Sequence, residues 1–242
     1  MKNPLIQFSL NETKDIWKIK EFLLRVSPKG GTEFLELVYQ RLPELKEIME
    51  LPKNIREKEI EKYVKNHYKK HCEKLALAVE ETTTEWSEFA PKFFISTNKI
   101  FKNMEWPEGE YQGYLSICPP YPRFLHSKTF QFSHRKSQMR IYGVAHEMWH
   151  FMFYEYIRKR YTPQLSNTLE GEMNELSEGK FKIPLWSLSE AFNIVLLSKE
   201  FGEGVGWATG SYTQLIPYLD QVTNTWEECG GDIDEFFTKM EA

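Results

Sequence analysis

The sequence predicts an α+β protein that is mostly helical and contains a small mixed or antiparallel sheet. Residues 1–90 carry apolar side chains at helical spacing, and the same spacing returns after residue 137. Between these regions lie short segments rich in aromatic and β-branched residues, which are typical of strands. We therefore expect a helical N-terminal lobe over 1–90 and a second domain over 91–242, whose sheet packs on the helix that begins near residue 137.

The N-terminal lobe is expected to contain three helices. The first runs from Glu12 to Val26 with its apolar residues on one stripe. The segment 27–31, with one Pro and two Gly, breaks it, and Thr32 is a suitable N-cap for a helix over 33–41. A longer helix over 55–81 is rich in Lys and Glu and has few apolar contacts, so we expect it to be largely solvated.

Three strands are expected between the two helical regions. They cover residues 92–97, 111–117 and 129–133, each bounded by Pro, Gly or Asn. The segment 118–122 contains three prolines, which cannot donate to the hydrogen-bond ladder of a central strand. We expect this segment to be a loop or to lie at the edge of the sheet.

The C-terminal region is expected to contain two apolar helices and two short ones. The apolar helices cover 137–160 and 187–197, and a polar excursion over 161–184 separates them. Four glycines between 202 and 210 interrupt the pattern. Two short helices, over 213–225 and 232–240, end the chain.

Composition excludes several classes of protein. The 242 residues carry a net charge of −4 and contain no basic block, so we expect no nucleic-acid partner. No apolar run reaches the roughly 18 residues that a membrane helix needs, and residues 1–22 lack the apolar core of a signal peptide. Three widely spaced cysteines, Cys72, Cys118 and Cys229, are typical of reduced thiols. The expectation is a cytoplasmic protein with no membrane partner.

The strongest motif is His146-Glu147-Met148-Trp149-His150, within the helix expected over 137–160. Residues four apart lie on the same face of an α-helix, so both imidazoles can bind one Zn²⁺. Glu147 can then take a proton from a water on the metal. The surrounding helix is largely apolar, and buried imidazole and carboxylate groups need partners that a metal supplies. The alternative without a metal is that both histidines are core residues satisfied by hydrogen bonds and that Glu147 lies on a solvated face.

A third ligand must come from elsewhere in the chain, because catalytic zinc usually has three protein ligands. In one class of zinc site the motif continues with a Gly and a third His at fixed offsets. Here Phe153 and Tyr156 occupy those two positions, so that class is excluded. Two glutamates remain. Glu190 lies in an apolar helix, where a carboxylate needs a counter-charge, whereas Glu170 lies in a polar, Gly-broken segment. We favour Glu190 and keep Glu170 as the alternative.

With these residues the chain resembles the gluzincin zinc metallopeptidases. The segment 145–150 resembles their active-site helix, and 189–191 resembles the helix of their third ligand. The resemblance spans about residues 110–200. It implies a zincin-like fold in which an edge strand of the sheet holds an extended peptide, with Glu147 as general base and acid. The Asp that commonly orients a ligand His after the third ligand is absent, and Asn193 is the available substitute.

A peptidase also needs a donor for the oxyanion that forms on the scissile carbonyl. Tyr212 and Tyr218 follow the third-ligand helix in a Gly-rich region, and we favour Tyr212. His126 and His134, near the strands, are weaker candidates. A sheet edge near 113–117 or 129–133 could add the peptide as an extra strand, and the alternative is that either segment is a paired interior strand.

The functional prediction is a zinc-dependent peptidase that hydrolyses peptide bonds with a metal-activated water and acts on a peptide or protein substrate. Two alternatives keep the same residues. One is a non-catalytic zinc domain with a filled fourth coordination site, for example by Cys118. The other is a protein-interaction domain that retains the fold and uses its helical lobe to bind a partner.

Overall fold

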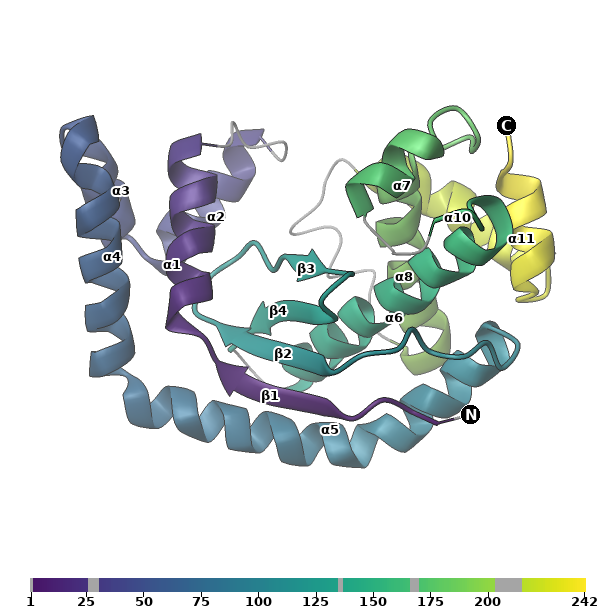
Figure 1. Cartoon of the computed structure of the whole chain (residues 1–242), viewed down its shortest axis with the longest axis horizontal. Helices are drawn as coiled ribbons and strands as arrows, with labels where there is room; N and C mark the ends of the chain where they lie inside the picture. The colour runs from purple at the N-terminus through teal and green to yellow at the C-terminus, as the bar shows by residue number, and fades with distance from the viewer. Residues whose placement is uncertain (1, 26–30, 135–136, 166–169, 203–214) are drawn as a thin grey trace.

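The computed structural model describes residues 2–25, 31–134, 137–165, 170–202 and 215–242. At the centre lies a four-stranded mixed sheet in the order β1-β2-β4-β3 (Figure 1). The strands are β1 (Ile6–Leu10), β2 (Tyr111–Ser116), β3 (Arg123–Phe124) and β4 (Thr129–Ser133). The expected α+β class with a small sheet is therefore confirmed.

The sheet is parallel except at one edge. β1 pairs parallel to β2, and β2 pairs parallel to β4. β3 pairs antiparallel to β4, with Arg123 opposite Phe130 and Phe124 opposite Thr129. The expectation that 113–117 or 129–133 offers a free edge is wrong, because β2 and β4 are both interior strands. The two edges are β1 and β3.

β1 is a strand in a region expected to be helical. Its register places Phe8 opposite Gly113 of β2, and a Cβ on Gly113 would lie 2.8 Å from Phe8 Cδ1 and 3.0 Å from Phe130 Cζ. The absence of a side chain at Gly113 thus leaves room for the rings of Phe8 and Phe130 from the two neighbouring strands. The alternation of apolar and polar residues over Ile6–Leu10 is a strand pattern that the helical expectation overlooked.

Helices from the N-terminal part of the chain gather beside the sheet (Figure 1). They are α1 (Glu12–Lys20), which continues as a π-helical turn η1 (Glu21–Arg25), α2 (Gly31–Arg41), α3 (Glu44–Glu50) and α4 (Lys53–Lys70). Asn11 caps α1 by accepting a hydrogen bond from the backbone N–H of Lys14, at 2.9 Å. The helix expected over 55–81 is two helices, because the chain turns at His71.

The second of these helices, α5 (Cys72–Ile100), contradicts the strand expected over 92–97. Its inward-facing residues recur at spacings of three and four along its whole length, so the aromatic run continues one helical stripe. Phe93 and Phe94 are both buried there. The indole N–H of Trp149 donates to Thr97 Oγ1 at 2.9 Å, which fixes α5 against the helix that carries the motif. α5 also passes through residues 90 and 91, where a domain boundary was expected.

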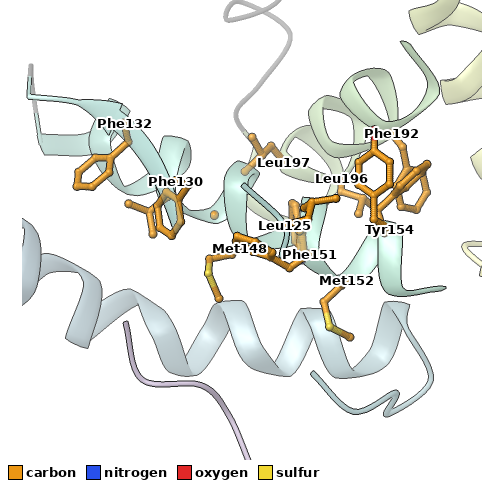
Figure 2. Close-up of a cluster of buried hydrophobic side chains, with 14 of the residues drawn as sticks. Leu125, Phe130, Phe132, Met148, Phe151, Met152, Tyr154, Phe192, Leu196 and Leu197 are labelled. Atoms are coloured by element: carbon orange, nitrogen blue, oxygen red, sulfur yellow. The ribbon is translucent and has the colours of Figure 1, made fainter. Parts of the chain in front are cut away.

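That helix is α6 (Ser137–Tyr161), which contacts β4, α5 and α8 (Leu185–Phe201). Figure 2 shows the apolar core that these elements share. Its labelled side chains are Leu125, Phe130, Phe132, Met148, Phe151, Met152, Tyr154, Phe192, Leu196 and Leu197. Between α6 and α8 lies the short helix α7 (Glu170–Leu176), inside the segment expected to be an irregular excursion.

The chain ends in α10 (Ile216–Glu228), which packs on α8, and α11 (Ile233–Met240), where two short helices were expected. Asp232 caps α11 by accepting hydrogen bonds from the backbone N–H groups of Asp234 and Glu235. Among the described helices, none is both long and apolar enough to cross a membrane.

A buried polar cluster ties α1 to the sheet. The side chains of Asp15 and Lys18 are fully buried and form an ion pair at 2.9 Å. Asp15 also accepts hydrogen bonds from Gln131 Nε2 of β4, at 2.9 Å, and from Tyr68 of α4, at 2.8 Å. Lys18 donates to the backbone carbonyl of Cys118. The cluster therefore holds the start of the proline-rich segment that leads into β3.

Candidate metal centre

Two helices bring three possible ligands together. His146 and His150 lie one turn apart on α6, and their Nε2 atoms are 3.0 Å from each other. Glu190 lies on α8, with Oε2 3.0 Å from Nε2 of His146 and Oε1 3.5 Å from Nε2 of His150. These three residues form the group of side chains that could hold a metal ion within the part of the chain that the structure describes.

The spacing around His146 suits a small tetrahedral ion. Zinc bonds of about 2.0–2.1 Å keep ligand atoms roughly 3.3–3.4 Å apart at the corners of a tetrahedron. Nε2 of His146 lies 3.0 Å from Nε2 of His150 and 3.0 Å from Oε2 of Glu190, slightly closer than that value. The 3.5 Å contact of His150 is with Oε1, the other carboxylate oxygen of Glu190. Two imidazole nitrogens and one carboxylate oxygen are also a ligand set that zinc takes in catalytic sites.

The donors are buried. His150 is 0 % exposed, His146 and Glu190 are each 2 % exposed, and Glu147 is 6 % exposed. Among the described side chains, Nδ1 of His150 and Oε2 of Glu147 are buried without a hydrogen-bond partner. Buried polar atoms in a native protein are ordinarily satisfied. The site therefore contains buried polar atoms that have no hydrogen-bond partner among the described atoms of the protein.

Arg123 of β3 reaches into this site, and the sequence analysis missed it. Its Nη1 lies 2.8 Å from Oε1 of Glu190, and its Nη2 lies 2.9 Å from Oε1 of Glu170. The same Nη1 is 3.9 Å from Oε2 of Glu147. One guanidinium therefore faces three carboxylates, and its side chain is 8 % exposed. The ring of Tyr154 lies under it, 5.8 Å from Cζ.

The charges of this cluster favour a cation. Three carboxyl groups, those of Glu147, Glu170 and Glu190, surround the single guanidinium of Arg123. Acidic side chains therefore outnumber basic ones around the possible ligands. A bound cation would add positive charge to this acidic cluster, which agrees with the ligand set.

The electrostatics of the site keep both kinds of ligand in the form that binds metal. Burial lowers the pKa of His150 well below its usual value, and the charge of Arg123 lowers it further, so the imidazole is neutral at physiological pH. Burial acts to raise the pKa of Glu190, but Arg123 at 2.8 Å outweighs it and holds that pKa well below its usual range. A neutral imidazole and an ionised carboxylate are the species that coordinate zinc.

The pKa of Glu147 is shifted in the opposite direction from that of Glu190. Burial raises the pKa of its carboxyl well above the usual value, and the charges of Glu190 and Glu170 add to this effect. Arg123 opposes the shift from 3.9 Å but does not cancel it. A carboxyl with a raised pKa beside possible metal ligands is the arrangement expected of a group that accepts and returns a proton.

Residues around the ligands fix the two helices relative to each other. Nδ2 of Asn193 donates to the backbone carbonyl of His146 at 3.1 Å. Asn193 thus contacts the main chain of α6, where the sequence suggested a role in orienting an imidazole. The hydroxyls of Tyr154 on α6 and Ser189 on α8 lie 3.3 Å apart. These contacts set the distance between the helix that carries the histidines and the helix that carries Glu190.

The other predicted residues lie as follows. Glu170, the alternative third ligand, contacts Arg123 and is not part of the group that could hold a metal. Tyr212 lies outside the described residues, so its role as oxyanion donor remains a prediction. Tyr218 packs among apolar side chains of α8 and α10, and His126 is exposed in the turn between β3 and β4. His134 contacts the backbone carbonyl of Ser116 through Nδ1.

Cys118, suggested as a fourth ligand of a closed site, lies elsewhere. Its thiol is buried near Lys18, and burial raises its pKa to about 11. It is not a member of the group that could hold a metal. Within the described part of the chain, the group that could hold a metal therefore consists of His146, His150 and Glu190.

A weak signal for Arg123 was present in the sequence. It directly follows the proline-rich segment 118–122, which was expected to lie at a sheet edge. Only the pairing of β3 with β4 places Arg123 beside α6 and α8, and that pairing is not visible in a two-residue strand.

Comparison of the chain with protein-family models, with curated proteins and with solved structures finds no match.

Proposed function

We propose that this protein is a zinc-dependent peptidase in which His146, His150 and Glu190 hold the metal and Glu147 is the general base. The observation that carries the proposal is the convergence of His146, His150 and Glu190 beside a buried carboxyl with a raised pKa. Nε2 of His146 lies 3.0 Å from both Nε2 of His150 and Oε2 of Glu190. A metal site with three protein ligands and an acid–base group is typical of metal-assisted hydrolysis.

Zinc is the favoured ion because the possible ligands are two imidazoles and one carboxylate. When bound, zinc would supply a Lewis acid that polarises a carbonyl and makes a water molecule easier to deprotonate. The residues present fit this ion, and the surplus of carboxyl groups over the one guanidinium fits a positively charged ligand.

Glu147 would perform the proton transfers. Its carboxylate takes a proton from the attacking water and returns it to the nitrogen of the leaving amine. Glu147 is the residue directly after the first histidine of the helix, so its carboxyl projects beside the ligand atoms. Near a divalent cation it loses its proton more readily than in the metal-free protein, because the cation favours the ionised form.

Arg123 would hold Glu190 in place. Its hydrogen bond occupies Oε1 of Glu190 and leaves Oε2, the oxygen nearer His146, facing the ligand group. Interactions of this kind orient a ligand and raise metal affinity. Its second hydrogen bond, to Glu170 of α7, fixes the position of the guanidinium.

The free edge of β3 is the surface on which an extended peptide would bind. The backbone N–H of Gln131 donates to the carbonyl of Pro122 at 2.9 Å. Backbone groups alternate in direction along a strand, so the N–H and C=O of Arg123 point away from β4. Arg123 thus offers a donor and an acceptor to an added strand, next to the candidate metal centre.

A direct test compares peptide cleavage by the zinc-loaded wild type with Glu147→Gln and with the control Glu172→Gln. Glu172 is exposed on α7. With a mixture of unstructured peptides and mass-spectrometric detection, the wild type and Glu172→Gln are expected to produce new termini. Glu147→Gln is expected to bind zinc normally and lose turnover by about 10²-fold or more. Equal cleavage by Glu147→Gln would remove the assigned base.

A second candidate is a zinc domain without turnover. The near-complete burial of Glu147 and of the three ligands favours it, because structural sites are closed to solvent. This alternative predicts zinc binding and zinc-dependent stability in the wild type, together with the absence of cleavage products from any peptide.

A further inference from the structure

An aromatic pair lies on the sheet face opposite the metal centre, at the strand that carries Arg123. Trp17 of α1 and Phe124 of β3 have ring centroids 5.7 Å apart, with their planes tilted by 56°. Trp17 is 43 % exposed, which is unusual for so large an apolar side chain in this protein. Figure 1 shows α1 beside the short strand β3 in the centre of the molecule.

Phe124 and Arg123 point to opposite faces, because successive side chains alternate along a strand. Arg123 lies on the face that meets α6 and α8, where it contacts Glu190. Phe124 lies on the face that meets α1, with Lys14 Nζ 4.7 Å from its ring centroid. Arg123 therefore contacts the candidate metal centre on one face of the sheet, and Phe124 belongs to the aromatic pair on the other.

A peptide added to the free edge of β3 would follow the same alternation. The peptide residue that pairs with Arg123 has its side chain on the metal-centre face, because paired residues point to the same side of a sheet. Its neighbour in the peptide then points to the opposite face, beside Phe124 and Trp17. These two peptide residues are adjacent, so one bound peptide would contact both Arg123 and the aromatic pair.

We propose that Trp17 and Phe124 form a subsite that selects an aromatic side chain in the peptide, one residue from the residue that pairs with Arg123. This inference rests on the proposed function for its setting, since it takes an extended peptide as the ligand of the β3 edge. Aromatic rings pack on one another in tilted and edge-to-face geometries of the kind that this pair already shows.

Lys14 sharpens the selection. Its ammonium lies 4.7 Å from the centroid of Phe124 and 5.2 Å from that of Tyr114. A lysine or arginine side chain of the peptide would bring a like charge to this position, whereas an aromatic ring would not. The subsite thus favours aromatic residues both by packing and by exclusion of basic residues.

The experiment uses a library of random decapeptides and full-length, zinc-loaded protein. Cleavage products of the wild type are expected to show an aromatic residue at one position, about 10- to 100-fold preferred over lysine. Trp17→Ala is expected to lose this preference and Trp17→Phe to retain it. Leu77→Ala removes another exposed apolar side chain, from α5, and is expected to leave the preference unchanged.

A binding readout separates this inference from the proposed activity. Zinc-loaded Glu147→Gln is used to capture peptides from the same library, with and without Trp17→Ala. Capture of aromatic peptides that depends on Trp17, without any cleavage by the wild type, would remove the peptidase proposal and leave the subsite in place. Capture or cleavage with the same sequence preference in the presence and absence of Trp17, or no capture at all, would overturn the subsite.

Discussion

Arg123 donates to Glu190 across a distance of 2.8 Å, and this pair joins the edge strand of the sheet to the helix that carries the third possible ligand. Both side chains are buried, at 8 % and 3 % exposure. The pair gives Glu190 a fixed orientation toward His146 and His150. It also makes the edge strand, the place where a peptide would bind, continuous with the candidate metal centre.

Removal of Arg123 is expected to destabilise the metal-free protein. Arg123→Ala leaves Glu190 and its neighbours without their cation, and the loss of one partner from a buried pair reduces the free energy of unfolding by about 3–5 kcal/mol. Zinc should then raise the melting temperature less in the variant than in the wild type, because Glu190 is no longer held toward the ligand group and zinc binds more weakly. Thermal unfolding with and without zinc measures both effects. Equal stability of wild type and variant would show that the pair is not buried as described.

Glu147 is expected to lower the stability of the metal-free protein at neutral pH. Because its folded pKa is raised well above 4.5, its neutral form is the stable one in the fold, and stability falls as pH rises through the folded pKa. Glu147→Gln should therefore be more stable than the wild type at neutral pH, with the difference vanishing below pH 4.5. Urea unfolding of both proteins at several pH values tests this. A variant that is less stable at neutral pH would contradict it.

The ion pair between Asp15 and Lys18 is expected to show strong coupling. Each side chain is fully buried, so Lys18→Met leaves a buried carboxylate unpaired and should reduce the free energy of unfolding by about 3–5 kcal/mol. Asp15→Asn leaves the opposite charge unpaired. The double variant should lose less stability than the two single variants combined, because neither charge remains. A double-mutant cycle by chemical unfolding measures this, and additive losses would exclude a buried pair.

The sequence predicted the local features of the site better than its long-range ones. The motif helix was visible from its apolar residues at spacings of three and four, and the helix with Glu190 from its long apolar run. The convergence of His146, His150 and Glu190 agrees with the ligand set that they suggested. Arg123 was not predicted, since its place in the site depends on the pairing of a two-residue strand with β4. No local pattern encodes that pairing.

The errors in the fold have similar causes. Residues 92–97 were expected to be a strand because a six-residue window of Phe, Ile and Thr matches strand preferences. In the structure the same residues continue the buried stripe of α5, which is visible only over a longer window. β1 was missed although its residues, Ile6–Leu10, alternate apolar and polar side chains in the way typical of a strand. Its partner β2 lies far along the chain, so no neighbouring strand or hairpin turn drew attention to this pattern.

The measurement that tests the central claim most directly is zinc stoichiometry of the purified protein after reconstitution and removal of loose metal. The wild type is expected to hold one equivalent of zinc. Glu190→Ala is expected to lose it, whereas Glu170→Ala, which removes a partner of Arg123 but no ligand, is expected to retain it. Binding of no zinc by the wild type, or a full equivalent in Glu190→Ala, would contradict the assignment of His146, His150 and Glu190 as a metal centre.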